Sequence, residues 1–304
     1  MDLSKINSIT IFKNYISAMC ENLDNKNIPD KIDLIIDGGA FNGSFAYGIL
    51  LYIKELEKIK MTKVERISGT SIGAVLGLLY LTNNLENEIN NFDEILNNFK
   101  NTLQLSNVKT IIANIVNKYI NDPAILNNKL FITYYDVKNM KQIMVNTYIN
   151  KEELIEILVK SIFVPILIDG SIFYKDDYCD GITPHIFKEE NNILFINLIT
   201  LKNLTTILNT KNETNIWSRL ITGVVDINNF LNNRGSLFCS YMYETSKLAL
   251  YIRFYICIAL IILLRIFIIF KSFIPSKLLE NKYIQKFKEL GIIAYQDLFN
   301  YLFI

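Results

Sequence analysis

The pentapeptide Gly69-Thr70-Ser71-Ile72-Gly73 constrains what this chain can fold into more than any other part of its sequence. Residues 64–68 before it read as a short strand, and the small and apolar residues after Ser71 predict a buried helix. A serine between two glycines at a strand-to-helix turn is typical of a nucleophile elbow, in which a strained turn exposes the hydroxyl. A glycine-rich turn without chemistry is the alternative, and the strand and helix on either side make it the weaker one.

A second glycine-rich loop, Asp37-Gly38-Gly39-Ala40-Phe41-Asn42-Gly43, lies between a predicted strand at 31–37 and a predicted helix at 44–58. About thirty residues separate the two loops, the length of a βαβ crossover, so we expect parallel strands with both loops at one edge of the sheet. Adjacent N–H groups in such a loop can stabilise an oxyanion. A phosphate or dinucleotide site fits less well, because Ala40 occupies the third glycine position and no Lys-Ser/Thr pair follows.

The serine needs a group that accepts its proton, and the chain has one histidine, His185. His185 follows Asp180 closely and would need an acid from elsewhere to complete a triad, so it remains an alternative. Asp180 itself belongs to Tyr178-Cys179-Asp180-Gly181, which comes after an earlier Asp169-Gly170 pair. A serine paired directly with an aspartate needs no histidine.

Taken in order, D-G-G-x-x-x-G, G-x-S-x-G and D-G on an α/β scaffold resemble the motifs of the patatin-like phospholipases, over roughly residues 30–205. The segment SIFVPILIDG at 161–170 is similar to the stretch before the family's catalytic aspartate. The resemblance implies a lipid acyl hydrolase acting on acyl esters of membrane phospholipids. It implies the following roles: Ser71 as nucleophile, Asp180 as base, Gly38, Gly39 and Ala40 as oxyanion-hole donors, and Asp37, Gly43, Gly69, Gly73 and Gly181 as supporting motif residues.

Three positions near the predicted centre depart from the family pattern. Ala40 replaces the usual third glycine, Asn42 stands where the family commonly has Arg or Lys, and Ile182 stands where Gly or Ala is typical. The methyl group of Ala40 restricts its φ angle but leaves its N–H group in place. The change at Asn42 removes a cation from the neighbourhood of the oxyanion. Because the serine and the aspartate are intact, we expect an active enzyme; a catalytically silent, lipid-binding membrane protein of the same shape is the alternative.

The order of predicted elements indicates an α/β fold: a three-layer, patatin-like sandwich with a mainly parallel central sheet, over residues 1–210. Further strands are expected at 130–137, 142–148 and 192–200, and a helix at 151–162. Residues 84–129 are not assigned. A polar stretch near residue 210 suggests a domain edge, and residues 211–304 are expected to be a helical C-terminal region.

Residues 254–270 are apolar except for Arg265, and together with 248–253 they are long enough to cross a bilayer as a helix. Summed insertion energies favour a membrane, because sixteen apolar residues outweigh one arginine. Spanning the membrane, lying in its interface and packing in a soluble core are the three alternatives. A serine esterase for soluble esters would not need this segment.

Composition narrows the remaining function classes. Lys plus Arg (31) nearly cancels Asp plus Glu (30), so no basic field favours nucleic acid. One histidine and four scattered cysteines, Cys20, Cys179, Cys239 and Cys257, offer no convincing ligand set, so we expect neither a metal nor an organic cofactor. The absence of a disulfide pattern and of a secretory signal predicts an intracellular, membrane-associated protein. Its protein partners are not predicted.

Overall fold

The computed structural model describes residues 3–23, 28–188, 192–200, 202–211, 213–273 and 282–303. In this part of the chain a seven-stranded sheet has the order β4-β3-β2-β1-β6-β7, with β5 paired to β3. The strands are β1 (Lys31–Ile36), β2 (Lys63–Thr70), β3 (Leu130–Asp136), β4 (Lys141–Val145), β5 (Tyr178–Asp180), β6 (Asn192–Ile196) and β7 (Cys239–Tyr241).

The four central strands are parallel, as the crossover length predicts. β1 pairs in parallel with β2 and β6, and β2 pairs in parallel with β3. The shorter strands β4, β5 and β7 add to this core in antiparallel fashion. The predicted α/β fold with a mainly parallel sheet is therefore confirmed, and the loops after β1 and β2 lie at the same edge.

Helices connect and cover the strands. The predicted helices at 44–58 and 151–162 are present, and the unassigned segment 84–129 contains two further helices. The helices are α1 (Leu3–Glu21), α2 (Gly43–Lys58), α3 (Ile72–Leu81), α4 (Ile89–Thr102), α5 (Val108–Tyr119), α6 (Lys151–Ile162), α7 (Trp217–Leu231), α8 (Glu244–Ser272) and α10 (Lys282–Phe303). Short 3₁₀ turns lie at η2 (Ala40–Asn42), η3 (Leu85–Glu88), η4 (Pro123–Leu126) and η5 (Leu204–Thr206).

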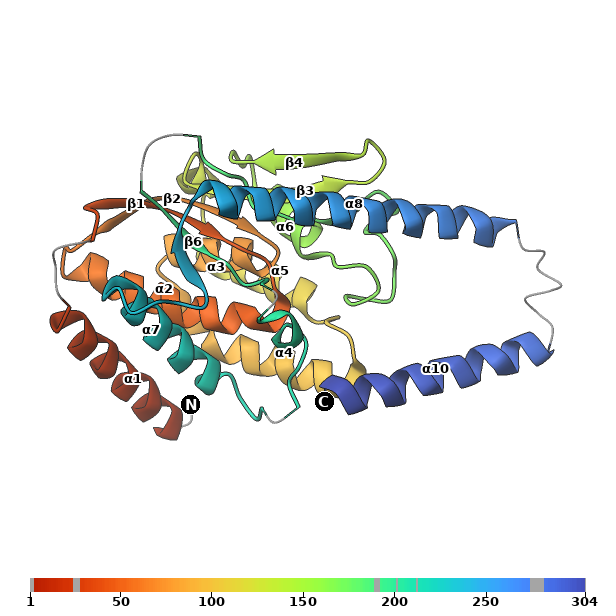
Figure 1. Ribbon diagram of the computed structural model, residues 1–304, viewed down its shortest axis with the longest axis horizontal. Coiled ribbons are helices and arrows are strands. Elements are labelled where there is room, and N and C mark those ends of the chain that lie inside the picture. Colours follow the sequence, from red (N-terminus) through yellow and green to blue (C-terminus); the bar gives the residue numbers. More distant parts are fainter. Residues whose placement is uncertain are drawn as a thin grey trace.

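The two faces of the sheet pack against different clusters of side chains, because side chains alternate along each strand. Leu34 and Ile36 of β1 belong to the large core beneath α2, α3 and α7, whereas Ile35 between them belongs to a small cluster that includes Leu250 of α8. Figure 1 shows α8 running alongside β3, with its far end extending past the sheet. Helices, sheet and α8 thus form three layers.

Two elements beyond the predicted edge at residue 210 belong to this architecture. β7 pairs with β6 in the sheet, and α7 crosses α2 at very short range. A side chain at Gly48 would come within 2.0 Å of the Leu220 carbonyl oxygen, and one at Gly223 equally close to that of Phe45. Only glycine permits this approach. We therefore propose that the α/β unit extends to about Tyr241.

α8 packs on the sheet with one side and leaves the other bare. Leu250 and Ile261 are buried, and Phe254, Ile258 and Leu264 pack partly against the neighbouring clusters. Within the described chain, α8 is long and apolar enough to cross a membrane. Only 6% of its most apolar 18-residue stretch is buried in the protein. Its large exposed side chains include Leu248, Tyr251, Ile252, Tyr255, Ile256, Leu260, Leu263 and Phe267.

Candidate active site

Ser71 sits at the turn between β2 and α3 in a strained conformation. Its φ is 53° and its ψ is −130°, a region that non-glycine residues rarely adopt. The tight turn brings Gly69 against Gly73, where a side chain on Gly69 would lie 2.5 Å from the Gly73 carbonyl. The Ser71 N–H donates to Ser161 Oγ of α6 at 2.9 Å, which fixes the turn from the far side. This is the geometry of a nucleophile elbow.

Asp180 ends β5, the short strand that pairs with β3. Its N–H donates to the Phe163 carbonyl at 2.9 Å, and its Oδ1 accepts from the Ile182 N–H at 2.9 Å. The Ser71 side chain is a neighbour of the Asp180 carboxylate, and its hydrogen-bonding contribution lowers the pKa of Asp180. Two residues more than a hundred positions apart in the sequence are thereby brought into contact.

The surroundings of Asp180 make it a better proton acceptor than an exposed carboxylate. Burial among apolar groups raises its pKa to about 6, and hydrogen bonds from Ser71 and Ile182 and the charge of Arg253 hold it from rising further. The negative charge of Asp37 raises it. A base with a pKa near the working pH is both ionised and basic enough to take a proton.

The glycine loop lies directly beside the serine, since a methyl group on Gly38 would lie 3.2 Å from Ser71 Cβ. The Gly38 N–H donates to Asp37 Oδ1 at 2.9 Å and is occupied by that bond. Phe41 and Asn42 donate to the Ile207 and Gly39 carbonyls. Among the described hydrogen bonds, none engages the N–H groups of Gly39 and Ala40.

Ala40 adopts a left-handed conformation with φ of 43°. For a residue with a side chain this region costs about 1–2 kcal/mol relative to the right-handed one. Ile182, another departure from the family pattern, has φ of 66° and is likewise strained. Both positions carry side chains where glycine would be unstrained, and the chain tolerates them at the two loops that flank Ser71.

Asn42 is buried and has a structural role. Its Nδ2 donates to the carbonyls of Leu198 and Asn203 at 2.9 and 3.1 Å, and its Oδ1 accepts from Thr206 and from Arg219. Arg219 of α7 is buried as well and also donates to the Thr206 and Asn209 carbonyls. Position 42 therefore holds the neighbouring loop in place, with a cation supplied by α7.

The alternative proton acceptors lie elsewhere. His185 stacks on Phe131 with a centroid distance of 5.8 Å and meets Phe187 edge-on, in the cluster beneath Leu250. Asp169 lies in an exposed turn, where its carboxylate pairs with Lys109 at 2.5 Å. Within the described residues, no group of His, Cys, Asp or Glu is arranged to hold a metal ion.

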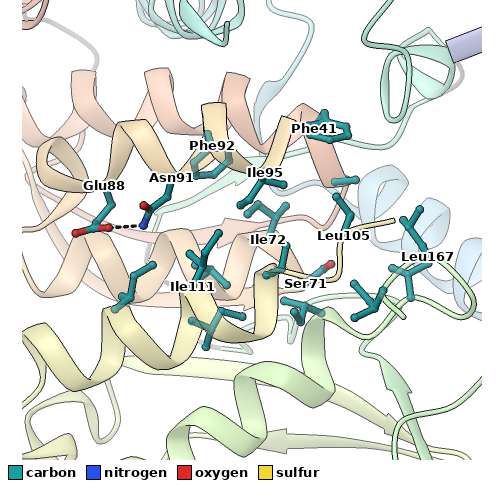
Figure 2. Close-up of a pocket in the computed structure, with 18 of the residues that line it drawn as sticks. Phe41, Ser71, Ile72, Glu88, Asn91, Phe92, Ile95, Leu105, Ile111 and Leu167 are labelled. Atoms are coloured by element: carbon teal, nitrogen blue, oxygen red, sulfur yellow. Dashed lines mark hydrogen bonds between the residues drawn. The ribbon is translucent and has the colours of Figure 1, made fainter. Parts of the chain in front are cut away.

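An apolar cavity, open to solvent, begins at Ser71 and Ala40. Its walls come from α3, α4 and α5, so the segment left unassigned in the sequence lines it. Glu88 and Asn91, hydrogen-bonded to each other, lie at the side of the cavity far from Ser71 (Figure 2). Apart from that end, the lining is almost wholly aliphatic and aromatic: Phe41, Ile72, Val75, Leu79, Phe92, Ile95, Leu105, Val108, Ile111, Ile112, Ile115, Ile162, Val164, Leu167 and Ile168.

Comparison with protein families agrees with this geometry. Residues 34–237 match the family model described as patatin-like phospholipase. The chain belongs to the patatin-like phospholipase family. Comparison with curated proteins gave no match. Patatin-like proteins are typically lipid acyl hydrolases, and the matched range of this one contains the nucleophile elbow, the glycine loop and Asp180.

Three residues of this patatin-like site escaped the sequence analysis. Ser161 begins the segment 161–170 but was given no role there, and Arg219 carries no motif; both roles depend on hydrogen bonds across the fold. Arg253 lies in the stretch 248–253, for which the sequence analysis predicts no catalytic role. Its guanidinium donates to both carboxylate oxygens of Asp37, at 2.6 Å each.

Proposed function

We propose that this protein hydrolyses fatty acyl esters of membrane phospholipids, with Ser71 as nucleophile and Asp180 as general base. The observation that carries the proposal is the Ser71 hydroxyl, held on a strained elbow beside the Asp180 carboxylate and lining an apolar cavity. An elbow serine needs a base, an oxyanion site and room for its substrate. Asp180, the glycine loop and the apolar cavity beside Ser71 are the candidates for these three parts.

In the first half of the reaction Ser71 Oγ attacks the ester carbonyl carbon and its proton passes to Asp180. The carbonyl oxygen becomes an oxyanion, for which the Gly39 and Ala40 N–H groups are the candidate donors. They have no other partner among the described hydrogen bonds, whereas the Gly38 N–H is held by Asp37. Preorganised donors of this kind contribute a large share of the rate.

Collapse of the tetrahedral intermediate breaks the ester C–O bond, and the leaving alkoxide takes the proton from Asp180. The acyl group stays on Ser71. Asp180, ionised again, removes a proton from a water molecule that attacks the acyl-enzyme carbonyl. The second intermediate collapses to free fatty acid and Ser71, which recovers its proton from Asp180.

The apolar cavity is the candidate site for the acyl chain. Ser71, Ile72, Val75 and Leu79 lie along one side of α3 and all line it. From Ser71 to Leu79 the helix rises about 12 Å at 1.5 Å per residue. An extended chain advances about 1.2 Å per bond, so roughly ten bonds fit before the polar end at Glu88. An apolar cavity of this kind favours a fatty acyl group over a short acetyl group.

The outer face of α8 supports a lipid surface as the place of action. The helix is about 40 Å long at 1.5 Å per residue, and side chains from Leu250 to Leu264 pack against the sheet along one side of it. An amphipathic arrangement with one protein-facing and one bare apolar side favours a helix lying in the membrane interface over a free-standing span. A lipid acyl hydrolase would then stay next to its substrate.

Fatty-acid release from phospholipid vesicles tests the proposal. Wild type should release fatty acid, Ser71→Ala should lose at least about 10²-fold in rate, and Ser218→Ala should keep the wild-type rate. Ser218 is an exposed serine in the first turn of α7, so it controls for serine loss without touching the site. A short-chain chromogenic ester, assayed in parallel, reports the chemistry without a membrane.

The competing functions predict other patterns. A soluble-ester esterase would turn over the chromogenic ester and leave vesicles intact. A silent lipid-binding protein would bind vesicles and turn over neither substrate, with circular dichroism showing a folded chain. Either pattern contradicts the phospholipase assignment.

A further inference from the structure

Asp37, the first residue of the glycine loop, is fully buried, and its charge is neutralised by a residue from α8. Arg253 Nη1 donates to Asp37 Oδ2 and Arg253 Nη2 to Asp37 Oδ1, both at 2.6 Å, in a bidentate pair. Asp37 Oδ1 also accepts from the Gly38 N–H, and the Asp37 N–H donates to the Ile196 carbonyl. Such planar pairing fixes orientation as well as distance. The carboxylate therefore links the start of the loop to α8.

Arg253 lies near the second carboxylate of the site too. Its charge acts on Asp180, while Asp37 acts on Asp180 in the opposite sense. Its Nε is buried and has no partner among the described residues. Three charged groups, two negative and one positive, therefore share one poorly hydrated region beside Ser71. In such surroundings a cation has a stronger effect than at the surface.

α8 touches both strands that lead to the motif residues. Leu250 packs against Ile35, two residues before Asp37, and Ile261 packs in the cluster that contains Cys179, the residue before Asp180. Arg253 lies between these two contacts on the same side of the helix. α8, which carries the exposed apolar face, therefore packs beside the two strands that lead to the glycine loop and to Asp180.

We propose that Arg253 is a positioning residue of the active site, and that through its pair with Asp37 the helix α8 holds the glycine loop ready to receive an oxyanion. The proposal rests on the proposed function. It makes α8 part of the catalytic unit as well as its contact with the lipid surface. Asn42 organises the loop at 198–206 together with Arg219 of α7, while Arg253 brings a second cation, from α8, to Asp37 at the start of the glycine loop.

A soluble short-chain ester separates this role from membrane anchoring, because its hydrolysis needs no lipid surface. Arg253→Met should lower kcat on this ester about 10²-fold with little change in KM. Arg265→Met is the matched control: the same change on the same helix, at a residue whose charge acts on Tyr135 and not on the loop. It should keep the wild-type rate. A helix that serves only as an anchor predicts that both variants keep that rate.

The pH profile adds a measurement that a simple loss of stability would not change. Ser71, the Ile182 N–H, Arg253 and Asp37 are the groups that act on Asp180. Removing the cation should move the acidic limb of kcat/KM to higher pH in Arg253→Met, and the limb should stay in place in Arg265→Met. Arg253→Lys keeps the charge and loses the bidentate geometry. Its limb should stay near the wild-type position while its kcat falls.

Stability is controlled by a double variant. Arg253→Met leaves Asp37 buried and unpaired, which lowers the melting temperature. Adding Asp37→Asn removes that buried charge, so the melting temperature should recover while the rate should not. Recovery of both would assign Arg253 to stability alone and overturn the proposal.

Hydrogen exchange of the peptide covering residues 37–43 reports the loop without any substrate. Exchange should rise at least tenfold in Arg253→Met and stay at the wild-type level in Arg265→Met. Unchanged exchange together with an unchanged soluble-ester rate in Arg253→Met overturns the proposed positioning role of Arg253. If wild type is inert on every ester while loop exchange still responds to Arg253→Met, the proposed function is overturned. The proposed link between Arg253 and the glycine loop is then retained.

Discussion

The two Asp-Gly pairs, Asp169-Gly170 and Asp180-Gly181, have the same two residues in opposite surroundings. Asp169 lies in an exposed turn, where hydrogen bonds from Lys109 and Ser171 outweigh the effect of partial burial and lower its pKa. Asp180 ends a strand beside Ser71, and burial raises its pKa to about 6. The dipeptide alone therefore does not make a base. The environment that the fold provides makes one.

The difference comes from strand pairing. β5 pairs with β3, and β3 pairs with β2, so Asp180 lies at the edge of the sheet where Ser71 follows β2. The turn at Asp169 lies between α6 and β5 and contacts α5 through Lys109. One carboxylate is thus enclosed by the sheet and the other remains in solvent. Substitutions at the two pairs should therefore differ in activity, in packing and in pH dependence.

The largest difference should be in activity. Asp180→Asn removes the proton acceptor and should lower kcat/KM on a soluble ester by about 10²–10⁴-fold. Asp169→Asn, the matched control in the same dipeptide, should stay within about twofold, because the side chain of Asp169 bonds to Lys109 and to its own turn among the described residues. Steady-state kinetics of the two folded variants checks this. Equal losses would show that the D-G turns act on the fold and that Asp180 is not the base.

Each motif lies within a few positions of the sequence and has a mechanical reason, so its local geometry can be predicted without the rest of the fold. The strained φ of Ser71 and the parallel β1-β2 pair follow directly from glycine spacing and crossover length. The resemblance of the motifs to the family predicts that Asp180 lies near Ser71. The effect of Ser71 on the pKa of Asp180 supports that placement.

What the sequence does not reveal depends on contacts between distant residues. The Arg253–Asp37 pair joins positions 216 apart, and the Asn42–Arg219 bond joins positions 177 apart. No local pattern in an apolar segment such as 254–270 indicates which carboxylate its neighbouring arginine will meet. The cavity walls were missed for a similar reason: α4 and α5 bring together apolar residues that are ordinary helix-face residues in the sequence.

The second difference should be in packing. A methyl group on Gly181 would lie 2.2 Å from the Thr133 carbonyl oxygen, so Gly181→Ala must push β5 away from β3 and should cost about 3 kcal/mol. Gly170 has space around it but a φ of 82°, so Gly170→Ala should cost about 1 kcal/mol. Chemical denaturation of both variants measures the two values. A smaller loss at Gly181 than at Gly170 would contradict the close approach of the two strands.

The third difference should be in the pH dependence of the rate. Asp180 must be ionised to accept a proton, so kcat/KM on a soluble ester should fall about tenfold per pH unit below its pKa of about 6. Asp169→Asn should give a profile that superimposes on wild type. A limb centred near the ordinary aspartate value would mean that burial does not act on the catalytic carboxylate, and an absent limb would exclude Asp180 as the base.

The fourth difference should be in the pH dependence of stability, and its sign should be opposite at the two pairs. The pKa of Asp180 is raised by folding, so the folded chain binds its proton more tightly and loses stability as pH rises from about 4 to about 6. Asp180→Asn removes this penalty and should stabilise the protein by about 1–3 kcal/mol at pH 7, with little effect below pH ~4.

Asp169 provides the control with the other sign. Its pKa is lowered by folding, so ionisation adds stability that is present above the unfolded pKa and is lost as pH falls through the folded one. Asp169→Asn should therefore destabilise the protein slightly at pH 7, by at most about 1 kcal/mol, as expected for a surface ion pair. Thermal unfolding of both variants at pH 4 and pH 7 checks the pair of signs. If Asp180→Asn also destabilises at pH 7, the carboxylate is better stabilised than its pKa indicates. The geometry of Asp180 would then serve the fold. A variant that is more stable but inactive would instead show that the aspartate is kept for its chemistry, at a cost to stability.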